Sequence, residues 1–524
     1  MEHSRETPPT RWVFIGILAL AWGAVLLLDR WLPQLSMAAI AAGIMIAYAV
    51  LLGYGELRNN SKNASSAPAQ PQLPSHPQTD STPQAPTLQG GAPEATTATP
   101  EKELTALAQL YPEALTRPSR QGQYSPQQSS VVPHEHIPTP RAKKPILVTV
   151  MVPAHNEEAV IETVIRLILA QTYEPLELIV IDDRSNDDTP IILRRLLAAN
   201  RLTKAPAPFQ VLFRGPDAVP GKAAVLNDAM ALANGQFIAV FDADAVMPTD
   251  FVARLMPYFD ESRVAAVQAR KVIANETQDL LTRCQAYEYT MDAQLQCGRD
   301  ALKSAVEIRG NGFLVRREAL ESVGGFTESS ITDDLDLSTK LHIVGWDIRF
   351  VPTVTVLEEG VSQWWPLVKQ RVRWAEGSLM RYLMYGGKIF KGFRRSPRAV
   401  LDMLAYFVQF LFPLWVISDY ILLAWDVFTG QALKGKILSS AVIMPLLFVF
   451  FAGSTAVGLR RFYKLDWVKS LLGGAMVGLY MPVVWLPVMF WVMGRLALMP
   501  RRVFHWEKTS HRGVASLPKA TDNS

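Results

Sequence analysis

Residues 146–158, ILVTVMVPAHNEE, contain the first of four apolar runs that decide the fold. Each run is short and is followed by polar residues, and the four occupy residues 146–152, 176–181, 209–213 and 237–241. Amphipathic stretches separate the runs at residues 158–170, 190–199 and 222–233. This alternation predicts an α/β domain whose mostly parallel sheet is covered by helices on both faces. Ligands bind such a domain at the carboxyl ends of its strands.

Acidic residues follow three of these predicted strands. Glu157 follows the first, Asp182 and Asp183 end the second in IDDRSNDDT, and Asp242 and Asp244 follow the fourth in FDADA. Each cluster alone is also typical of a solvated turn or a helix cap. Together they meet at one sheet edge, where carboxylates suit Mg²⁺ or Mn²⁺ and phosphate oxygens complete the coordination.

Other motifs lie between and beyond these clusters. Lys222 begins a predicted helix, where it could face a diphosphate or be an ordinary surface lysine. Asp333 and Asp334 precede an amphipathic helix, and their plain interpretation is as carboxylates that complement the helix dipole. The sequence QRVRW, residues 370–374, lies in a segment rich in tryptophan and arginine, which is also typical of a helix at a membrane interface.

Composition excludes several classes of protein. The chain has 524 residues, of which 49% are hydrophobic and 19% charged, and this balance favours membrane contact. A net charge of +4 is too small for this length to indicate nucleic-acid binding. The two cysteines, Cys284 and Cys297, cannot form a disulfide framework or a four-ligand zinc site.

The hydrophobic residues are concentrated at the two ends of the chain. Residues 1–56 contain two uncharged apolar runs that predict two transmembrane helices, and the flanking basic residues place both of their ends in the cytoplasm. Residues 57–143, rich in Pro, Gln, Ser and Thr, predict a disordered linker. The soluble body, residues 144–360, is then expected in the cytoplasm.

The C-terminal part predicts an interfacial segment followed by spans. Residues 361–398 are amphipathic and basic, residues 399–500 predict about three transmembrane segments, and residues 501–524 form a basic tail. Three spans would place the tail outside, whereas its basic residues favour the cytoplasm. Either one apolar segment is re-entrant, or the last one turns at Pro482 or Pro487.

Taken in order, the motifs resemble those of a known family. DD at residues 182–183, DxD at 242–244, TDD at 332–334 and QxxRW at 370–374 resemble the membrane-embedded branch of the family 2 glycosyltransferases. The resemblance covers residues 146–381 and implies the GT-A fold of nucleotide-diphospho-sugar transferases. The third motif is more often Thr-Glu-Asp in this branch, and here Asp333 replaces the glutamate.

The resemblance implies a role for each matching residue. The residues expected to bind the UDP-sugar are Glu157, Asp182, Asp183, Lys222, Asp242, Gln370, Arg373 and Trp374. Asp244, with Asp242, would hold a Mg²⁺ or Mn²⁺ ion on the diphosphate, and Asp334 would be the general base that takes the acceptor's proton. One displacement with one base implies inversion, and therefore a β-glycoside. The acceptor would lie near Gly310, Asn311, Gly312 and Asp333.

Two acceptor classes share these motifs. EIRGNG at residues 307–312, SITDDLDL at 330–337, RWAEG at 373–377 and WEKTSH at 506–511 resemble the cyanobacterial lipid glycosyltransferases that make β-monoglucosyldiacylglycerol. We therefore expect an integral membrane enzyme that moves glucose from UDP-glucose to 1,2-diacylglycerol, with the bilayer and a lipid acceptor as partners. The alternative is a processive polysaccharide synthase of the poly-N-acetylglucosamine, cellulose or hyaluronan type.

Overall fold

The carboxyl ends of the predicted strands do meet at one edge of a sheet in the computed structural model. The structure describes residues 146–498 except 203–207, 409, 411–419, 422 and 431–438. The two N-terminal spans, the linker and the basic tail with its WEKTSH sequence lie outside the described residues.

Seven strands form one sheet in the order β3-β2-β1-β4-β6-β5-β7. The strands are β1 (Val148–Ala154), β2 (Leu176–Asp182), β3 (Phe209–Phe213), β4 (Phe237–Val240), β5 (Val264–Ile273), β6 (Phe313–Arg316) and β7 (Asp347–Glu358). β6 is antiparallel to β4 and β5, and the other neighbouring pairs are parallel. The predicted mostly parallel sheet is confirmed, and all four predicted strands belong to it.

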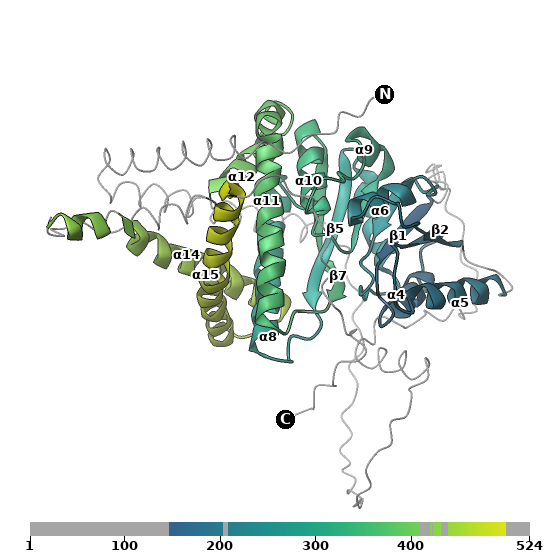
Figure 1. Ribbon diagram of the computed structural model, residues 1–524, viewed down its shortest axis with the longest axis horizontal. Helices are drawn as coiled ribbons and strands as arrows, with labels where there is room; N and C mark the ends of the chain where they lie inside the picture. The colour runs from purple at the N-terminus through teal and green to yellow at the C-terminus, as the bar shows by residue number, and fades with distance from the viewer. Residues whose placement is uncertain are drawn as a thin grey trace, which may run out of the picture.

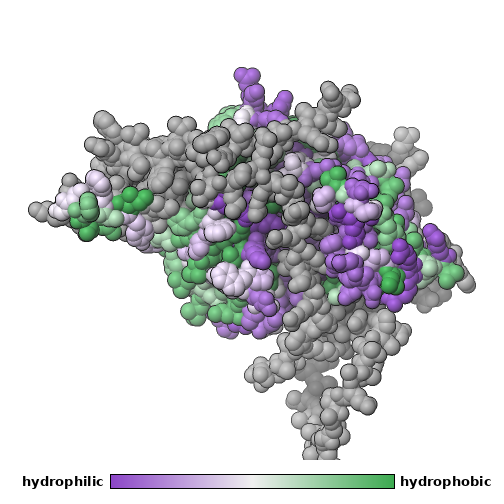
Figure 2. Space-filling view, in the orientation of Figure 1, coloured by the Kyte–Doolittle hydropathy of each residue, from purple (hydrophilic) through white to green (hydrophobic). Residues whose placement is uncertain are grey.

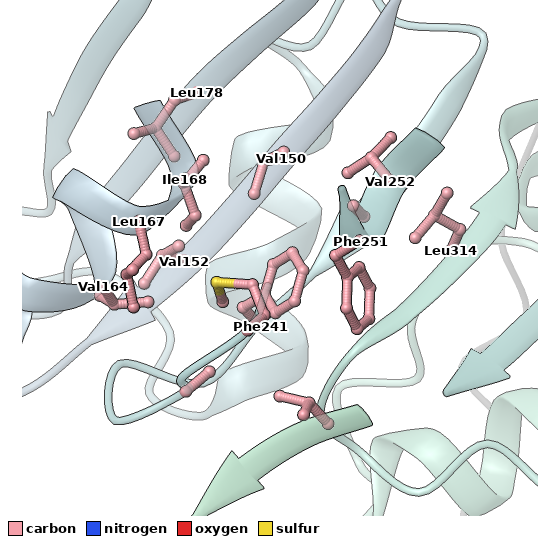
Figure 3. Packing of buried hydrophobic residues seen from close by; sticks show 14 of the residues in the cluster. Val150, Val152, Val164, Leu167, Ile168, Leu178, Phe241, Phe251, Val252 and Leu314 are labelled. Atoms are coloured by element: carbon pink, nitrogen blue, oxygen red, sulfur yellow. The ribbon is translucent and has the colours of Figure 1, made fainter. Parts of the chain in front are cut away.

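Helices cover both faces of this sheet. They are α4 (Ile161–Leu169), α5 (Thr189–Arg201), α6 (Lys222–Met230), α7 (Phe251–Leu255), the 3₁₀ helix η2 (Met256–Asp260), α8 (Leu280–Leu302), α9 (Arg317–Ser322) and α10 (Asp333–Val344). Because side chains alternate along a strand, Val150 and Val152 pack with α4, α5 and α7, whereas Met151 packs with α6, α8 and α10 on the opposite face. Figure 3 shows part of the first core, where Phe241 and Phe251 lie beside the valines of β1.

Further helices towards the C-terminus stand beside the sheet domain, among them α11 (Trp364–Gly392), α12 (Pro397–Val408), α14 (Ser439–Phe462) and α15 (Trp467–Leu498). In Figure 1, α11 and α8 lie between the sheet and the apolar pair α14 and α15. α8 contacts β5 and β7 as well as α14 and α15, so it joins the two parts. The apolar surface in Figure 2 gathers where α14 and α15 lie, and the polar surface gathers over the sheet domain.

Within the described residues, two segments are long and apolar enough to cross a membrane, Met444–Tyr463 and Trp467–Leu496. They correspond to the second and third apolar segments of the C-terminal part. α15 runs as one helix through Pro482 and Pro487, so of the two alternatives left open by the sequence, the turn at either proline is wrong. The first segment begins as α12, which ends at Val408, and most of residues 409–438 lie outside the part that the structure describes.

Candidate active site

The loops after β1 and β2 are joined by hydrogen bonds into one polar edge. The backbone N–H of Asn156 donates to Ser185 Oγ at 2.9 Å, and the Asn156 side chain accepts from the backbone of Asn186 at 2.8 Å. The backbone N–H of Glu157 donates to Thr189 Oγ1 at 2.8 Å. Several polar residues of the first two clusters therefore hold the site's edge together.

Asp182 and Asp183 lie at the end of β2 but have different surroundings. Asp183 is 1% exposed, and its carboxylate accepts hydrogen bonds from Arg184 at 2.9 Å and from Arg214 at 2.8 Å. Oδ1 of Asp182 is also buried, but no described residue donates a hydrogen bond to it. Burial raises the pKa of Asp182. Asp182 therefore has an acceptor atom available for a ligand, whereas Asp183 orients two arginines.

Lys222 begins α6 and joins two of the predicted motifs. Its Nζ lies 2.6 Å from Asp242 Oδ1 and donates to the carbonyl of Gly310 at 3.0 Å. Burial lowers the pKa of Lys222, but the carboxylates of Asp242 and Asp333 raise it by more, so it stays above its ordinary value. Lys222 is therefore a fixed positive charge among the carboxylates.

The donor set fits a divalent cation held jointly with a diphosphate. Asp244 is 8% exposed and lies at the polar end of the cavity described below, together with Asp242. In the described part of the chain, no group of three His, Cys, Asp or Glu side chains could hold a metal ion. Two carboxylates require further oxygen ligands, which phosphate groups supply. Asp242 also pairs with Lys222, which brings a positive charge to the same place.

Asp333 and Asp334 form the first turn of α10. Oδ1 of Asp334 accepts a hydrogen bond from the backbone of Leu335 at 2.8 Å, and a Cβ placed on Gly310 would lie 3.0 Å from its Oδ2. Burial and the neighbouring Asp333 carboxylate raise the pKa of Asp334 to about 6. Oδ2 of Asp333 is buried, and no described residue donates to it. A carboxylate with a pKa near 6 can accept a proton near neutral pH, as a general base must.

The EIRGNG segment brings glycine backbone close to this base. Gly310 and Gly312 have φ angles of +81° and +66°, and a Cβ on Gly312 would lie 2.6 Å from Val356. Asn311 is fully buried and accepts a hydrogen bond from the backbone of Asp242 at 3.2 Å. Gly310 thus lines the site, whereas Asn311 and Gly312 support it from behind.

The QxxRW residues lie on α11, and a glycine of this helix lets it pack close to the residues at the start of α10. Gln370, Arg373 and Trp374 all line the cavity. One turn later, a Cβ on Gly377 would overlap the side chain of Thr332, the residue that precedes Asp333. The close packing of α11 against this residue brings the fourth motif beside the third.

Sequence reasoning missed a buried cluster of charges behind the EIRGNG segment. Glu307 lies 3.2 Å from Arg299 of α8, 3.0 Å from Arg309 and 2.6 Å from Arg381 of α11, and Arg299 also lies 3.2 Å from Asp402 of α12. Burial raises the pKa of Glu307, but the three guanidinium groups lower it by more. Because Arg381 and Asp402 lie far from Glu307 in the sequence, no local pattern indicated the whole cluster.

Sequence reasoning also missed a second polar group, at the ends of β5 and β7. Lys271 lies 2.9 Å from Glu358, and Tyr289 of α8 donates to the same glutamate at 2.6 Å. Lys271 also donates to the carbonyl of Arg309 at 3.1 Å. Glu358 could have been found as an acidic residue at the end of a strand. The sequence pattern, however, did not predict β5 or β7.

One cavity of about 1300 Å³ joins the polar residues to the apolar helices. Its polar end is lined by predicted residues: Glu157, Lys222, Asp242, Asp244, Gly310, Asp333, Asp334, Gln370, Arg373 and Trp374. Its other part is lined by apolar side chains of α14 and α15, among them Leu447, Phe451, Met481, Val484 and Val488. Asp182, Asp183, Asn311 and Gly312 do not line this cavity.

The arrangement agrees with comparisons of the whole chain. Residues 145–377 match the family described as glycosyltransferase like family 2. A β-monoglucosyldiacylglycerol synthase of Trichormus variabilis is 38% identical over 369 residues, which are 70% of this chain and 76% of that protein. The chain belongs to the family 2 glycosyltransferases.

Further proteins resemble this family 2 glycosyltransferase. A β-monoglucosyldiacylglycerol synthase of Synechocystis is 34% identical over 379 residues, 70% of this chain and 74% of that protein. A solved mannosyltransferase of Pyrobaculum calidifontis, in complex with GDP-Man and Mn²⁺, matches 64% of this chain and 87% of that chain at 22% identity, with a TM-score of 0.41. The family resemblance of the four motifs is confirmed, and with it the expectation of an enzyme with a GT-A fold.

Proposed function

We propose that this glycosyltransferase moves glucose from UDP-glucose to the free hydroxyl of 1,2-diacylglycerol, giving β-monoglucosyldiacylglycerol. The relatives named β-monoglucosyldiacylglycerol synthase support this assignment. The observation that carries it is the shape of the cavity, which has carboxylates and a lysine at one end and the apolar side chains of α14 and α15 at the other. A diacylglycerol has the same division, with one hydroxyl at the head and two apolar chains.

The donor would lie at the polar end. Asp182, whose buried Oδ1 accepts no hydrogen bond from a described residue, would bind an N–H group of uracil, while Asp183 holds the surrounding arginines in place. Lys222 supplies a positive charge for the diphosphate, and Gln370, Arg373 and Trp374 face the same space from α11. Mg²⁺ or Mn²⁺, held by Asp244 and the diphosphate, would offset the negative charge that grows on the departing UDP.

The acceptor would approach from the apolar end with its hydroxyl towards Asp334. Asp334 takes the hydroxyl proton as the oxygen forms a bond to the anomeric carbon, and the bond from that carbon to UDP breaks. Attack opposite the leaving group inverts the configuration, so an α-linked donor gives a β-glycoside. The buried oxygen of Asp333 can accept a hydrogen bond from a second hydroxyl, of the sugar or of the acceptor.

The membrane would hold the enzyme through α14 and α15, with the catalytic body on the cytoplasmic side. The outward faces of both helices carry large exposed apolar side chains, including Val449, Val457, Leu472 and Leu479. Exposed apolar side chains on two long adjacent helices suit contact with lipid tails. Trp364 and Trp365, both exposed at the start of α11, suit the bilayer interface.

Purified enzyme, supplied with UDP-[¹⁴C]glucose, Mg²⁺ and diacylglycerol, tests this proposal. We expect one organic-soluble product that a β-glucosidase cleaves. A parallel series with UDP-galactose and UDP-N-acetylglucosamine should show much slower transfer. An aqueous product of heterogeneous size would instead establish the alternative, a polysaccharide synthase. The relatives named β-monoglucosyldiacylglycerol synthase favour a lipid acceptor over that alternative.

A further inference from the structure

A buried glutamate at the middle of α8 lies where the catalytic domain meets the apolar helices. Glu288 is 6% exposed, and both of its carboxylate oxygens accept hydrogen bonds. Oε1 accepts from Trp485 Nε1 at 3.0 Å, and Oε2 accepts from Tyr480 at 3.2 Å and from Arg371 at 2.7 Å. Tyr480 and Trp485 belong to α15 and Arg371 belongs to α11, so one carboxylate joins three helices.

Arg371 extends this connection to the QxxRW motif. Its side chain is fully buried, and its Nη1 donates to Gln370 Oε1 at 2.9 Å. Its guanidinium also lies 4.1 Å from the ring centroid of Trp374 and 5.8 Å from that of Trp485. One guanidinium group therefore contacts two of the three motif side chains that line the cavity. Arg371 itself does not line it.

We propose that Glu288 and Arg371 are positioning residues that set the side chains of Gln370 and Trp374 according to the position of α15. Tyr480 and Trp485 fix the carboxylate of Glu288, which orients the guanidinium of Arg371. That guanidinium in turn orients the amide of Gln370 and the ring of Trp374. This inference rests on the proposed glycosyl transfer and adds a connection between the apolar helices and the donor end of the site.

The arrangement has the features of a specific positioning device. A buried ion pair gives little net stability compared with apolar residues of the same size, because both charges lose their hydration. The ion pair of Glu288 and Arg371 instead fixes the orientation of both side chains, because planar guanidinium and carboxylate groups pair in only a few geometries. Trp485 also lines the cavity on its apolar side. A displacement of α15 at the lipid end would therefore reach Gln370 through hydrogen bonds and Trp374 through the guanidinium that lies over its ring.

Conservative variants on α15 test the connection without altering the motif. Tyr480→Phe and Trp485→Phe each remove one hydrogen bond to Glu288 and keep most of the packing. Tyr463→Phe is the matched control, because Tyr463 donates to Glu276 at 2.6 Å, a bond of the same type that does not involve Arg371. The full-length protein is purified in detergent. UDP binding and activity of all variants are compared at equal concentrations of folded protein.

The readout is UDP affinity in the presence of Mg²⁺, measured by calorimetry, because it does not depend on the acceptor. We expect Tyr480→Phe and Trp485→Phe to weaken UDP binding roughly three- to tenfold, with a fall in kcat for transfer. Tyr463→Phe should leave both unchanged. Weakening by the two α15 variants and not by the control supports the connection even if the acceptor is a lipid other than diacylglycerol.

Variants of Glu288 separate positioning from stability. Glu288→Gln keeps the shape but removes the charge that orients Arg371, so its loss of UDP affinity should exceed that of Tyr480→Phe. Tyr480→Phe in the Glu288→Gln background should then have little further effect, since both changes act through one group. Unchanged UDP affinity in Tyr480→Phe and Trp485→Phe would overturn the proposal, as would fully additive losses in the double variant.

Discussion

Asp334 is the proposed general base, and its environment suits that role. Burial and the adjacent Asp333 raise its pKa to about 6, while the N–H of Leu335 fixes one of its oxygens. A base must be ionised to accept a proton, so Asp334 is active above about pH 6 and protonated below it. This environment depends on tertiary packing and could not be read from the sequence TDD.

The pH profile of transfer tests this assignment. The value of kcat/KM should rise with pH and level off above an apparent pKa of about 6, because kcat/KM reports the free enzyme and the ionised fraction of its Asp334 rises. Asp333→Asn removes a negative charge that raises this pKa, so its acid limb should move to lower pH. Asp334→Asn should lose roughly 10²- to 10⁴-fold in kcat and retain UDP binding. An unchanged acid limb in Asp333→Asn, or near-normal turnover in Asp334→Asn, would contradict the assignment.

The sequence located most of the site residues but not their individual environments. DD, DxD, TDD and QxxRW each indicated residues near the predicted edge of the sheet. The distinction between Asp182 and Asp183 depends on Arg214, which lies after the next helix and strand and has no motif of its own. Such pairs become visible only when the chain is folded.

At the scale of elements, the contact between α11 and the start of α10 sets the distance between the QxxRW motif and the base. A Cβ on Gly377 would overlap Thr332, whereas a Cβ on Gly386 or Gly387 of the same helix would have no atom of the described residues within 4 Å. Glycine within a helix costs about 1 kcal/mol relative to alanine, so its use at Gly377 requires a reason. The reason is the close approach of the two helices.

Substitution of these glycines separates helix propensity from packing. Gly377→Ala should push α11 away from Thr332 and lower kcat roughly tenfold to a hundredfold, since small misplacements of catalytic groups are costly. Gly386→Ala, the matched control, should leave kcat unchanged and slightly stabilise the fold. Steady-state kinetics and thermal unfolding of both variants measure the two effects. Equal kcat values for the two variants would show that the contact is not needed for catalysis.

Elements differed in how far they could be predicted. β1 to β4 are continuous apolar runs and were predicted with small differences in their ends, because buried parallel strands have a local signature. α8 carries buried polar residues such as Gln285, Gln296 and Arg299, whose partners lie outside the helix. A helix that buries polar side chains on several sides has no clear apolar stripe, so it was not anticipated.

At the scale of the whole molecule, the cavity is formed jointly by the sheet domain and the apolar helices. The sequence indicated a carboxylate-rich edge, a basic amphipathic segment and apolar spans as separate features. It could not show that α8 and α11 bring the carboxylates and the lining of α14 and α15 into one space of about 1300 Å³. That juxtaposition depends on long-range contacts such as those of Glu288 and Glu307.

Photo-crosslinking with a diacylglycerol that carries a diazirine on one acyl chain tests whether the acyl chains of the acceptor lie in the apolar part of the cavity. If the acyl chains lie there, the labelled peptides should include cavity-lining residues such as Leu447, Phe451, Val484 and Val488. Excess unlabelled diacylglycerol should suppress this labelling, and UDP with Mg²⁺ should not. Labelling that is confined to outward-facing residues such as Leu471 and Leu479, and that unlabelled diacylglycerol does not suppress, would show that the acyl chains do not enter the cavity.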